Sequence, residues 1–173
     1  MKLRKKISML LVFGMCFSTM LLPNSSNAYQ FLSNKLYTPK DAYYWIHGAF
    51  DNYGLKSEVK RGLTAWNPLP EIEFTKEGSL PAGADVKLEY VDNYWGDTYA
   101  IHRGSGNITF YKKWRVELNS LRRMETAVHE VGHALGLDHT QKKNDSVSVM
   151  RQYGFNDKDF PLSDDKAGIS AKY

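Results

Sequence analysis

The sequence has 173 residues, of which 42% are hydrophobic, 24% charged and 13% aromatic. This is typical of one globular domain and excludes a collagen, a coiled coil or a wholly disordered chain. The formal net charge is +4, but four of the basic residues lie in the first 28 residues, which hold no acid, so the remainder is formally neutral. The high pI of about 9.0 therefore gives no support for nucleic-acid binding, and we expect no nucleic-acid partner.

Residues 1–28 are predicted to be a secretory signal peptide. Residues 2–6 are basic, an apolar stretch follows from Ile7 to Leu22, and the small residues Ser26 and Ala28 lie three and one positions before a cleavage site after Ala28. The alternative is an uncleaved membrane anchor, but the apolar stretch is shorter than the about 20 residues that a spanning helix needs. We therefore expect a secreted protein without stable membrane insertion after cleavage.

The mature chain is predicted to contain no disulfide, because the only cysteine, Cys16, lies within the signal peptide. Outside the cell its stability must come from its hydrophobic core and from any metal ions that it binds. Residues 29–40 are interpreted as a short lead-in or pro-segment, and residues 41–173 as one folded domain. We expect this domain to be a monomer.

Hydrophobic periodicity predicts the elements of this domain in the following chain order: strand 43–50, helix 57–67, strands 71–75, 86–90, 98–102 and 107–111, helix 122–135, and a last helix from 163 onward. Ser57 and Ser163 are predicted to be helix N-caps. Asp164 and Asp165 would favour the start of the last helix through its dipole. The order predicts an α/β sandwich, of the α+β type, in which a mixed twisted sheet packs on helices.

Three histidines and a glutamate occur at fixed spacings between His129 and His139. On a helix His129 and His133 lie one turn apart on one face, so they can present two imidazoles to one metal ion. Glu130 points in a neighbouring direction and can reach a water on that ion without being a ligand. Gly136 allows a sharp turn with positive φ, after which His139 returns as a third imidazole. Three histidines with one open position indicate a catalytic zinc site, because structural zinc sites are closed by four protein ligands.

We therefore predict that these three histidines bind one catalytic zinc ion and that Glu130 is the catalytic residue. The remaining two histidines, His47 and His102, are interpreted as surface residues or as hydrogen-bonded core residues. The acidic loop residues Asp92 and Asp97 can bind calcium, although solvated turn residues are the default interpretation.

The pattern from His129 to His139, HExxHxxGxxH, is the zinc signature of the metzincin clan of metalloendopeptidases, and Ser148-Val149-Met150 resembles the methionine turn of that clan. Within the clan the chain most resembles the matrixins, over roughly residues 42–173. The supporting segments are 59–74, 84–88 and 162–169, which resemble their first helix and second strand, their third strand and the start of their last helix. The chain departs from the family in having Thr140 where matrixins usually have serine, in lacking a pro-peptide cysteine, and in shortening the loop that carries their structural zinc.

The resemblance implies a secreted zinc-dependent endopeptidase with an active-site helix, a methionine turn and a C-terminal helix. In such an enzyme Glu130 takes a proton from zinc-bound water and passes it to the leaving amine. One of the strands within 98–111 should be the sheet edge, where an extended peptide or protein substrate adds as a further strand. The competing functions are a non-catalytic zinc or peptide-binding module and a zinc hydrolase of a non-peptide amide or ester. Intact Glu130 argues against a binding module, and only the resemblance and the expected edge strand favour peptides.

Four residues near the predicted site have two interpretations each. By resemblance Tyr153 and Phe155 wall a side-chain pocket beside the zinc, and plain core packing is the alternative. Asp164 and Asp165 hold the methionine turn or the new N-terminus by resemblance, or they only favour the start of the last helix.

Overall fold

The computed structural model describes residues 29–173, so the predicted signal peptide lies outside the described residues. The strands are β1 (Ala42–Ile46), β2 (Phe74–Glu77), β3 (Val86–Val91), β4 (Ala100–His102) and β5 (Asn107–Tyr111). The helices are α1 (Ala49–Asn52), α2 (Lys56–Thr64), α3 (Lys112–Glu117), α4 (Ser120–Ala134) and α5 (Ser163–Lys172), with 3₁₀ turns at Pro39–Asp41 and Lys142–Val147. No helix among residues 29–173 has the length and apolar character that crossing a membrane requires.

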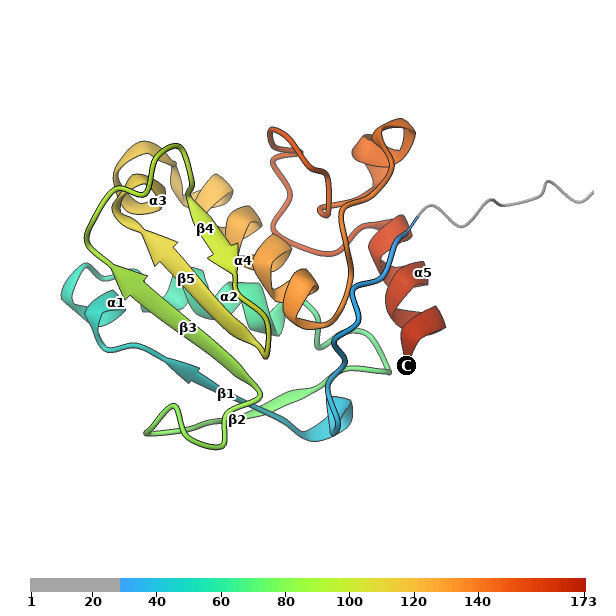
Figure 1. Ribbon diagram of the computed structural model, residues 1–173, viewed down its shortest axis with the longest axis horizontal. Helices are drawn as coiled ribbons and strands as arrows, with labels where there is room; N and C mark the ends of the chain where they lie inside the picture. The colour runs from blue at the N-terminus through green and yellow to red at the C-terminus, as the bar shows by residue number, and fades with distance from the viewer. Residues whose placement is uncertain (1–28) are drawn as a thin grey trace, which may run out of the picture.

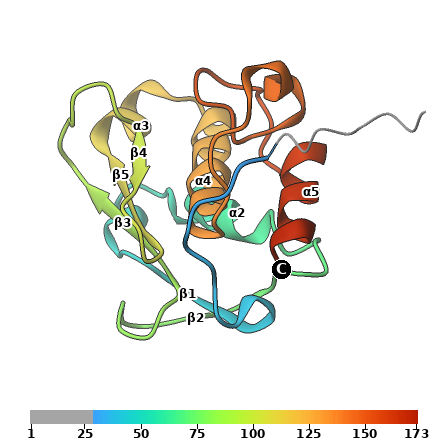
Figure 2. The same ribbon diagram turned by 45° about the vertical axis from the view of Figure 1, so that its right-hand side comes forward.

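The five strands form one mixed sheet in the order β2-β1-β3-β5-β4 (Figure 1). β1 is parallel to β2 and β3, and β3 is parallel to β5, whereas β4 pairs antiparallel with β5. Figure 2 shows α2 and α4 between the sheet and α5. The predicted sandwich of a mixed sheet on helices is confirmed, and β4 is the edge strand expected within residues 98–111.

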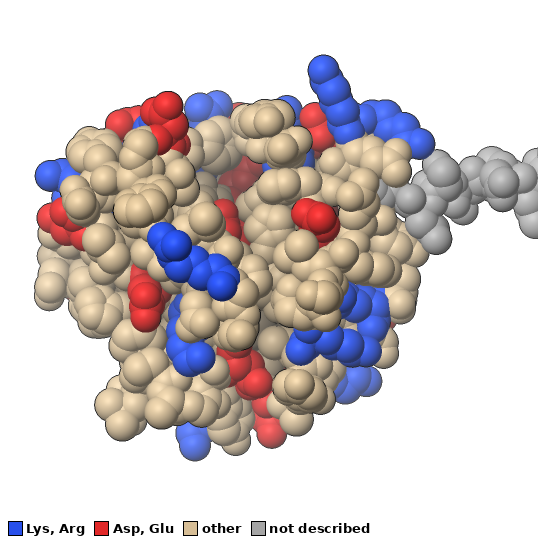
Figure 3. Space-filling view, in the orientation of Figure 1, with Lys and Arg blue, Asp and Glu red and all other residues tan. Residues whose placement is uncertain are grey.

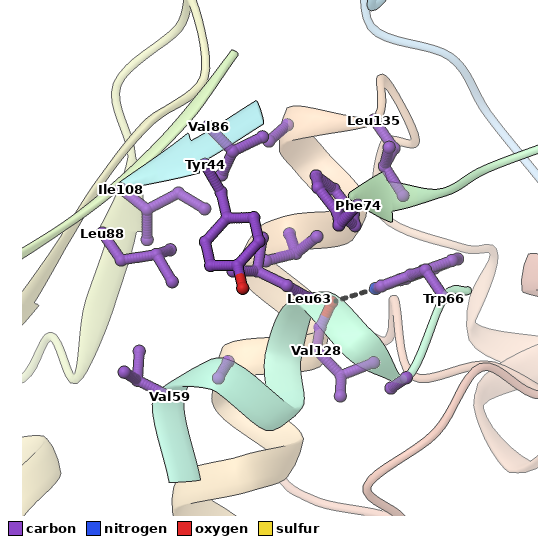
Figure 4. Packing of buried hydrophobic residues seen from close by; sticks show 14 of the residues in the cluster. Tyr44, Val59, Leu63, Trp66, Phe74, Val86, Leu88, Ile108, Val128 and Leu135 are labelled. Atoms are coloured by element: carbon purple, nitrogen blue, oxygen red, sulfur yellow. Dashed lines mark hydrogen bonds between the residues drawn. The ribbon is translucent and has the colours of Figure 1, made fainter. Parts of the chain in front are cut away.

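The core joins the inner face of the sheet to α2 and α4. Val59 and Leu63 of α2 face Leu88 and Ile108 of the sheet (Figure 4), and all four side chains are completely buried. Burial of each such side chain stabilises the fold by about 1.5–3 kcal/mol. The indole Nε1 of Trp66 donates a hydrogen bond of 3.3 Å to the carbonyl oxygen of Val128, so the segment after α2 is also fixed to α4. This packing holds α4, which carries His129 and His133, two of the three predicted metal ligands, against the sheet.

Several predicted boundaries are wrong, each for a local reason. The strand predicted over 43–50 ends at Ile46, and Phe50 lies in the short helix α1, where its buried ring packs against those of Phe110 and Trp114. One buried aromatic residue gives the same hydrophobic pattern in a strand as in a four-residue helix, so periodicity could not distinguish the two structures. The helix α3 was not predicted, because only Trp114 of its six residues is buried.

The predicted caps are also displaced by one or two residues. The N-cap of α2 is Leu55 and that of α5 is Leu162, so Ser57 and Ser163 lie inside the first turns instead. The second strand begins at Phe74, later than predicted, because the side chain of Asn67 accepts a hydrogen bond of 2.9 Å from the Phe74 backbone N–H and fixes the preceding loop.

Candidate metal centre

The helix α4 is specified at both ends by its sequence. Asn119 is the N-cap, and its side-chain oxygen accepts a hydrogen bond of 2.9 Å from the backbone N–H of Arg122. At the other end Gly136 has φ +90°, and the backbone N–H groups of Gly136 and Leu137 donate to the carbonyls of His133 and Gly132, both at 2.9 Å. This is a Schellman motif, which needs a residue that tolerates positive φ. The chain reverses here, as predicted, and returns His139 toward the helix.

The three predicted histidines lie together in the structure. The ring centroids of His129 and His133 are 4.7 Å apart, those of His133 and His139 4.8 Å, and those of His129 and His139 5.3 Å. One ring nitrogen from each lies within 4.8 Å of the other two. These three side chains could therefore hold one metal ion, and zinc is commonly bound by histidine nitrogens.

Two of these imidazoles are oriented by backbone carbonyl groups. The Nδ1 atom of His129 is 2.7 Å from the carbonyl oxygen of Val149, and Nδ1 of His133 is 2.8 Å from that of Leu137. A carbonyl oxygen only accepts, so each Nδ1 carries the proton and donates it. This tautomer leaves the Nε2 lone pair free for a metal, and it fixes the ring plane.

The electrostatics of the three imidazoles also suit a metal. Burial lowers the pKa of His129 to about 3 and that of His133 to about 4, and burial lowers the pKa of His139 as well. All three are therefore neutral at neutral pH. Neutral imidazole is the form that binds a metal ion.

Glu130 directly follows His129 in α4 and is buried, and it lines the same pocket as His129. Its Oε2 atom has no hydrogen-bond partner within residues 29–173. Burial raises the pKa of this carboxyl to about 7, and a hydrogen bond from the backbone of His102 opposes the rise. A buried carboxylate oxygen without a partner is costly, and a water on a metal at the three histidines would supply one. The residues present thus fit a catalytic zinc ion.

His102 does not match its interpretation as a surface or hydrogen-bonded core histidine. Its ring stacks beside that of His133 with 6.4 Å between centroids, and its Nε2 is buried without a partner among the described residues. Burial lowers the pKa of this imidazole. It is not part of the group that can share one metal. The signal that could have placed it is its position at the end of the predicted edge strand. His47, in contrast, makes an edge-to-face contact with Trp45 of β1, with 5.5 Å between ring centroids.

The segment under the histidines is held by Asp165 of α5. The backbone N–H groups of Val149 and Leu162 donate to its carboxylate at 2.8 and 2.7 Å, and the Ser148 hydroxyl donates to it as well. Asp164 accepts a hydrogen bond of 2.7 Å from the hydroxyl of Thr140, the residue after His139. Both acids therefore do more than favour the helix start. Asp165 fixes the segment whose Val149 carbonyl orients His129.

Residues 44–173, well over half of the chain, match the family model described as Matrixin. The chain belongs to the matrixin family. This is a family of zinc metalloendopeptidases, and the zinc-binding signature, the fold and the histidine cluster of this chain agree with it.

Three relatives are similar to this matrixin domain. Matrix metalloproteinase-20 of Homo sapiens is 28% identical over 135 residues, which is 66% of this chain and 27% of the relative. Macrophage metalloelastase of Oryctolagus cuniculus is 28% identical over 136 residues, 66% of this chain and 28% of the relative. Stromelysin-2 of Rattus norvegicus is 25% identical over 136 residues, 68% of this chain and 28% of the relative. The chain thus matches less than a third of the length of these relatives.

Met150 packs closely against α4. Its side chain is 2% exposed and packs on Gly132, which lies in α4 between the first two predicted ligands. A Cβ atom added at Gly132 would lie 2.3 Å from the sulfur of Met150 and 3.1 Å from the ring of Trp66, which is also buried. The helix can therefore approach the methionine turn this closely only with glycine at position 132.

Replacing Gly132 by alanine is expected to lower the free energy of unfolding by about 1–3 kcal/mol, because two buried side chains must move to admit the methyl group. Urea unfolding of the zinc-free protein measures this. Gly48→Ala is the matched control, since an added Cβ there has nothing within 4 Å and the backbone φ is −60°. Equal stability of the two variants would contradict the close packing.

A pocket of about 450 Å³ opens beside His129 and Glu130. Tyr153 and Phe155 both line it, as the matrixin resemblance implied. The Tyr153 side chain is 75% exposed, which rules out plain core packing for it, and the ring of Phe155 faces that of Tyr99 at 6.0 Å. The pocket wall is thus partly aromatic.

The sequence analysis did not identify Glu125, which fixes the outer wall of this pocket. It lies one helical turn before His129, is 3% exposed, and accepts backbone hydrogen bonds from Asn156 at 2.6 Å and Lys158 at 3.2 Å. Burial raises the pKa of its carboxyl, and these hydrogen bonds oppose the rise. The signal was available in the sequence, because Glu125 and His129 share a helix face at i and i+4.

Asp92 and Asp97, the two acids considered as calcium ligands, are engaged in other contacts. Asp92 accepts hydrogen bonds of 2.9 Å from the hydroxyls of Tyr53 and Tyr90 and from the guanidinium of Arg115. Asp97 pairs with the ammonium of Lys113 at 2.8 Å. Neither acid joins a cluster of metal-ligating side chains among the described residues.

Proposed function

We propose that this chain is a secreted zinc endopeptidase in which His129, His133 and His139 bind one zinc ion and Glu130 is the general base. The observation that carries the proposal is the arrangement of three neutral imidazoles around one point with the unpartnered Glu130 Oε2 beside them. Three protein ligands leave a position open for water and substrate, as catalysis requires. Secretion rests on the sequence pattern of residues 1–28.

A zinc ion bound at these residues supplies a Lewis acid that polarises the scissile carbonyl and acidifies its bound water. Glu130 accepts the proton of the attacking water at Oε2 and returns it to the leaving amine. The carbonyl groups of Val149 and Leu137 keep two imidazoles in the tautomer that binds metal.

The substrate is proposed to be an extended peptide that pairs with β4. Within residues 29–173 this strand has β5 on one side and no strand on the other, and it lies beside α4 (Figure 1). Main-chain hydrogen bonds to such an edge depend little on the side chains of the substrate, so selectivity among substrates would come from the pocket beside His129. Tyr99, Val149 and Phe155 in its lining favour an apolar side chain. Figure 3 shows acidic and basic side chains interspersed over the drawn face, so we expect little selection between acidic and basic substrates there.

We propose that Asp92 and Asp97 are not calcium ligands. A calcium ion at Asp92 would have to displace Arg115 and two tyrosine hydroxyls, and at Asp97 it would have to displace Lys113. These existing partners argue for solvated and paired turn residues, the default interpretation of both acids.

The test is cleavage of unfolded casein by purified residues 29–173, with mass spectrometry of the new amino termini. We expect chelator-sensitive cleavage at a restricted set of peptide bonds. One bound zinc per chain without any peptide cleavage would contradict the proposal and favour a binding module. Hydrolysis of small esters or amides without peptide cleavage would instead favour a non-peptide hydrolase.

A further inference from the structure

Residues 29–36, which we call the N-terminal strap, lie along the turn that joins α4 to His139. The backbone N–H of Leu32 donates to the carbonyl of Gly136 at 2.9 Å, and the N–H of Asp138 donates to the carbonyl of Gln30 at 2.8 Å. Figure 2 shows this segment, in blue, passing the C-terminal end of α4 and α5. The strap is therefore hydrogen-bonded to Gly136 and Asp138, the residues directly before and after Leu137.

Leu137 is the residue whose carbonyl oxygen orients the ring of His133, at 2.8 Å from Nδ1. Asp138, the next residue paired with the strap, directly precedes His139. The strap thus holds the backbone around Leu137, which orients His133, and the backbone of Asp138, which precedes His139. None of its residues lines the pocket beside His129.

Within the strap, Asn34 makes direct side-chain contact with α4, the helix that carries His129 and His133. Its side-chain Nδ2 donates hydrogen bonds of 2.9 Å to the carbonyl oxygens of both His133 and Ala134. The last carbonyls of a helix have no partner within the helix, and they need one from elsewhere. Asn34 supplies a partner to the carbonyl of Ala134, and it adds a second donor to that of His133, which also accepts from the Gly136 N–H.

The C-terminal end of the chain completes this arrangement. The hydroxyl of Tyr173 donates to the carbonyl of Leu135 at 2.9 Å and accepts from the backbone N–H of Leu36 at 3.0 Å. An added Cβ at Gly136 would lie 2.3 Å from the carbonyl oxygen of Asn34, so strap and turn are in close contact. The strap and Tyr173 together therefore fix the C-terminal end of α4.

We propose that the N-terminal strap, through Asn34, is a positioning element for the zinc ligands that raises the affinity of the site for zinc. This inference rests on the proposed assignment of the ligands. Asn34 acts through the backbone of residues 133–138 and touches neither metal nor substrate. An imidazole held in its binding geometry before the metal arrives loses less freedom on binding, so loosening the turn weakens the site.

The test compares zinc binding by the intact chain, residues 29–173, and by its Asn34→Ala and Asn34→Leu variants, in competition with a chromophoric chelator. Partners outside the ligand set of a metal site typically change affinity about 10–100-fold. We expect a zinc dissociation constant raised about 10-fold and a faster release of zinc in both variants. Tyr37→Ala is the matched control, because this neighbouring side chain is 99% exposed, and its zinc affinity should equal that of the wild type.

Thermal unfolding with and without zinc separates positioning from general stability. A positioning role predicts that the rise in Tm caused by zinc shrinks in the Asn34 variants. Equal lowering of both midpoints with an unchanged zinc dissociation constant would overturn the proposal. If the Asn34 variants fail to fold, Tyr173→Phe, which removes the hydroxyl that donates to Leu135 and accepts from Leu36 of the strap, is expected to weaken zinc binding measurably, and unchanged binding would overturn the proposal. Absence of zinc binding in the wild type would instead refute the proposed function.

Discussion

Replacing Glu130 by alanine is expected to lower kcat about 10²–10⁴-fold while one zinc ion stays bound per chain. The three imidazoles supply the metal ligands, and Glu130 Oε2 has no partner within residues 29–173. Removing the carboxylate therefore removes the base without opening the metal site. Steady-state hydrolysis of a peptide substrate gives kcat, and atomic absorption gives the zinc content.

Glu89→Ala serves as the control for this variant, since Glu89 is an exposed acid in the middle of β3 and should leave kcat unchanged. Full activity of Glu130→Ala would contradict the proposed mechanism. Loss of zinc together with activity would show that Glu130 acts on the metal site instead of on the water.

Replacing His133 by alanine is expected to remove both zinc and turnover. His133 contributes the central imidazole of the three, with ring centroids 4.7 and 4.8 Å from those of His129 and His139. Its loss leaves two ligands, and the zinc affinity should fall by more than the ~100-fold that loss of a supporting partner can cost. Zinc stoichiometry after dialysis and the same peptide assay measure the two effects.

His47→Ala is the matched histidine control, because His47 contacts Trp45 of β1 edge-to-face and lies outside the metal-binding group. It should retain one zinc and full turnover. If His133→Ala kept its zinc, the metal would have to be bound elsewhere, and the ligand assignment would be wrong.

The parts of the fold that were predictable are those whose signal is local. Strands β3 and β5 and helix α4 have regular alternation or helical spacing, and the structure has them close to the predicted ranges. The short helix α1 was missed because the burial of Phe50 comes from rings far along the chain, such as Phe110. Tertiary packing decides such segments, and periodicity over a few residues cannot.

The candidate site also has a part that the sequence predicts and a part that it does not. The spacing of His129, His133, Gly136 and His139 could be interpreted directly, because one helix and one turn bring these residues together. The groups that orient them could not, since the Val149 and Leu137 carbonyls are backbone atoms present at every position.

The contact of Asn34 could not be predicted, because it joins residues distant in sequence. For Asp165 only the matrixin resemblance offered a role, which was to hold the methionine turn or the new N-terminus. Asn34 reaches His133 from the N-terminal strap, and Asp165 reaches Val149 from α5. Neither contact leaves a spacing signal in the sequence. The support of the ligands therefore becomes visible only in the folded chain.

The most direct test of the central claim is a titration of metal-free protein, residues 29–173, with zinc while peptide cleavage is measured. One site built by His129, His133 and His139 with Glu130 predicts no cleavage before zinc is added. It then predicts a linear rise in rate and a break at one equivalent of zinc per chain. Cleavage by the metal-free protein, or no cleavage with one equivalent bound, would contradict it.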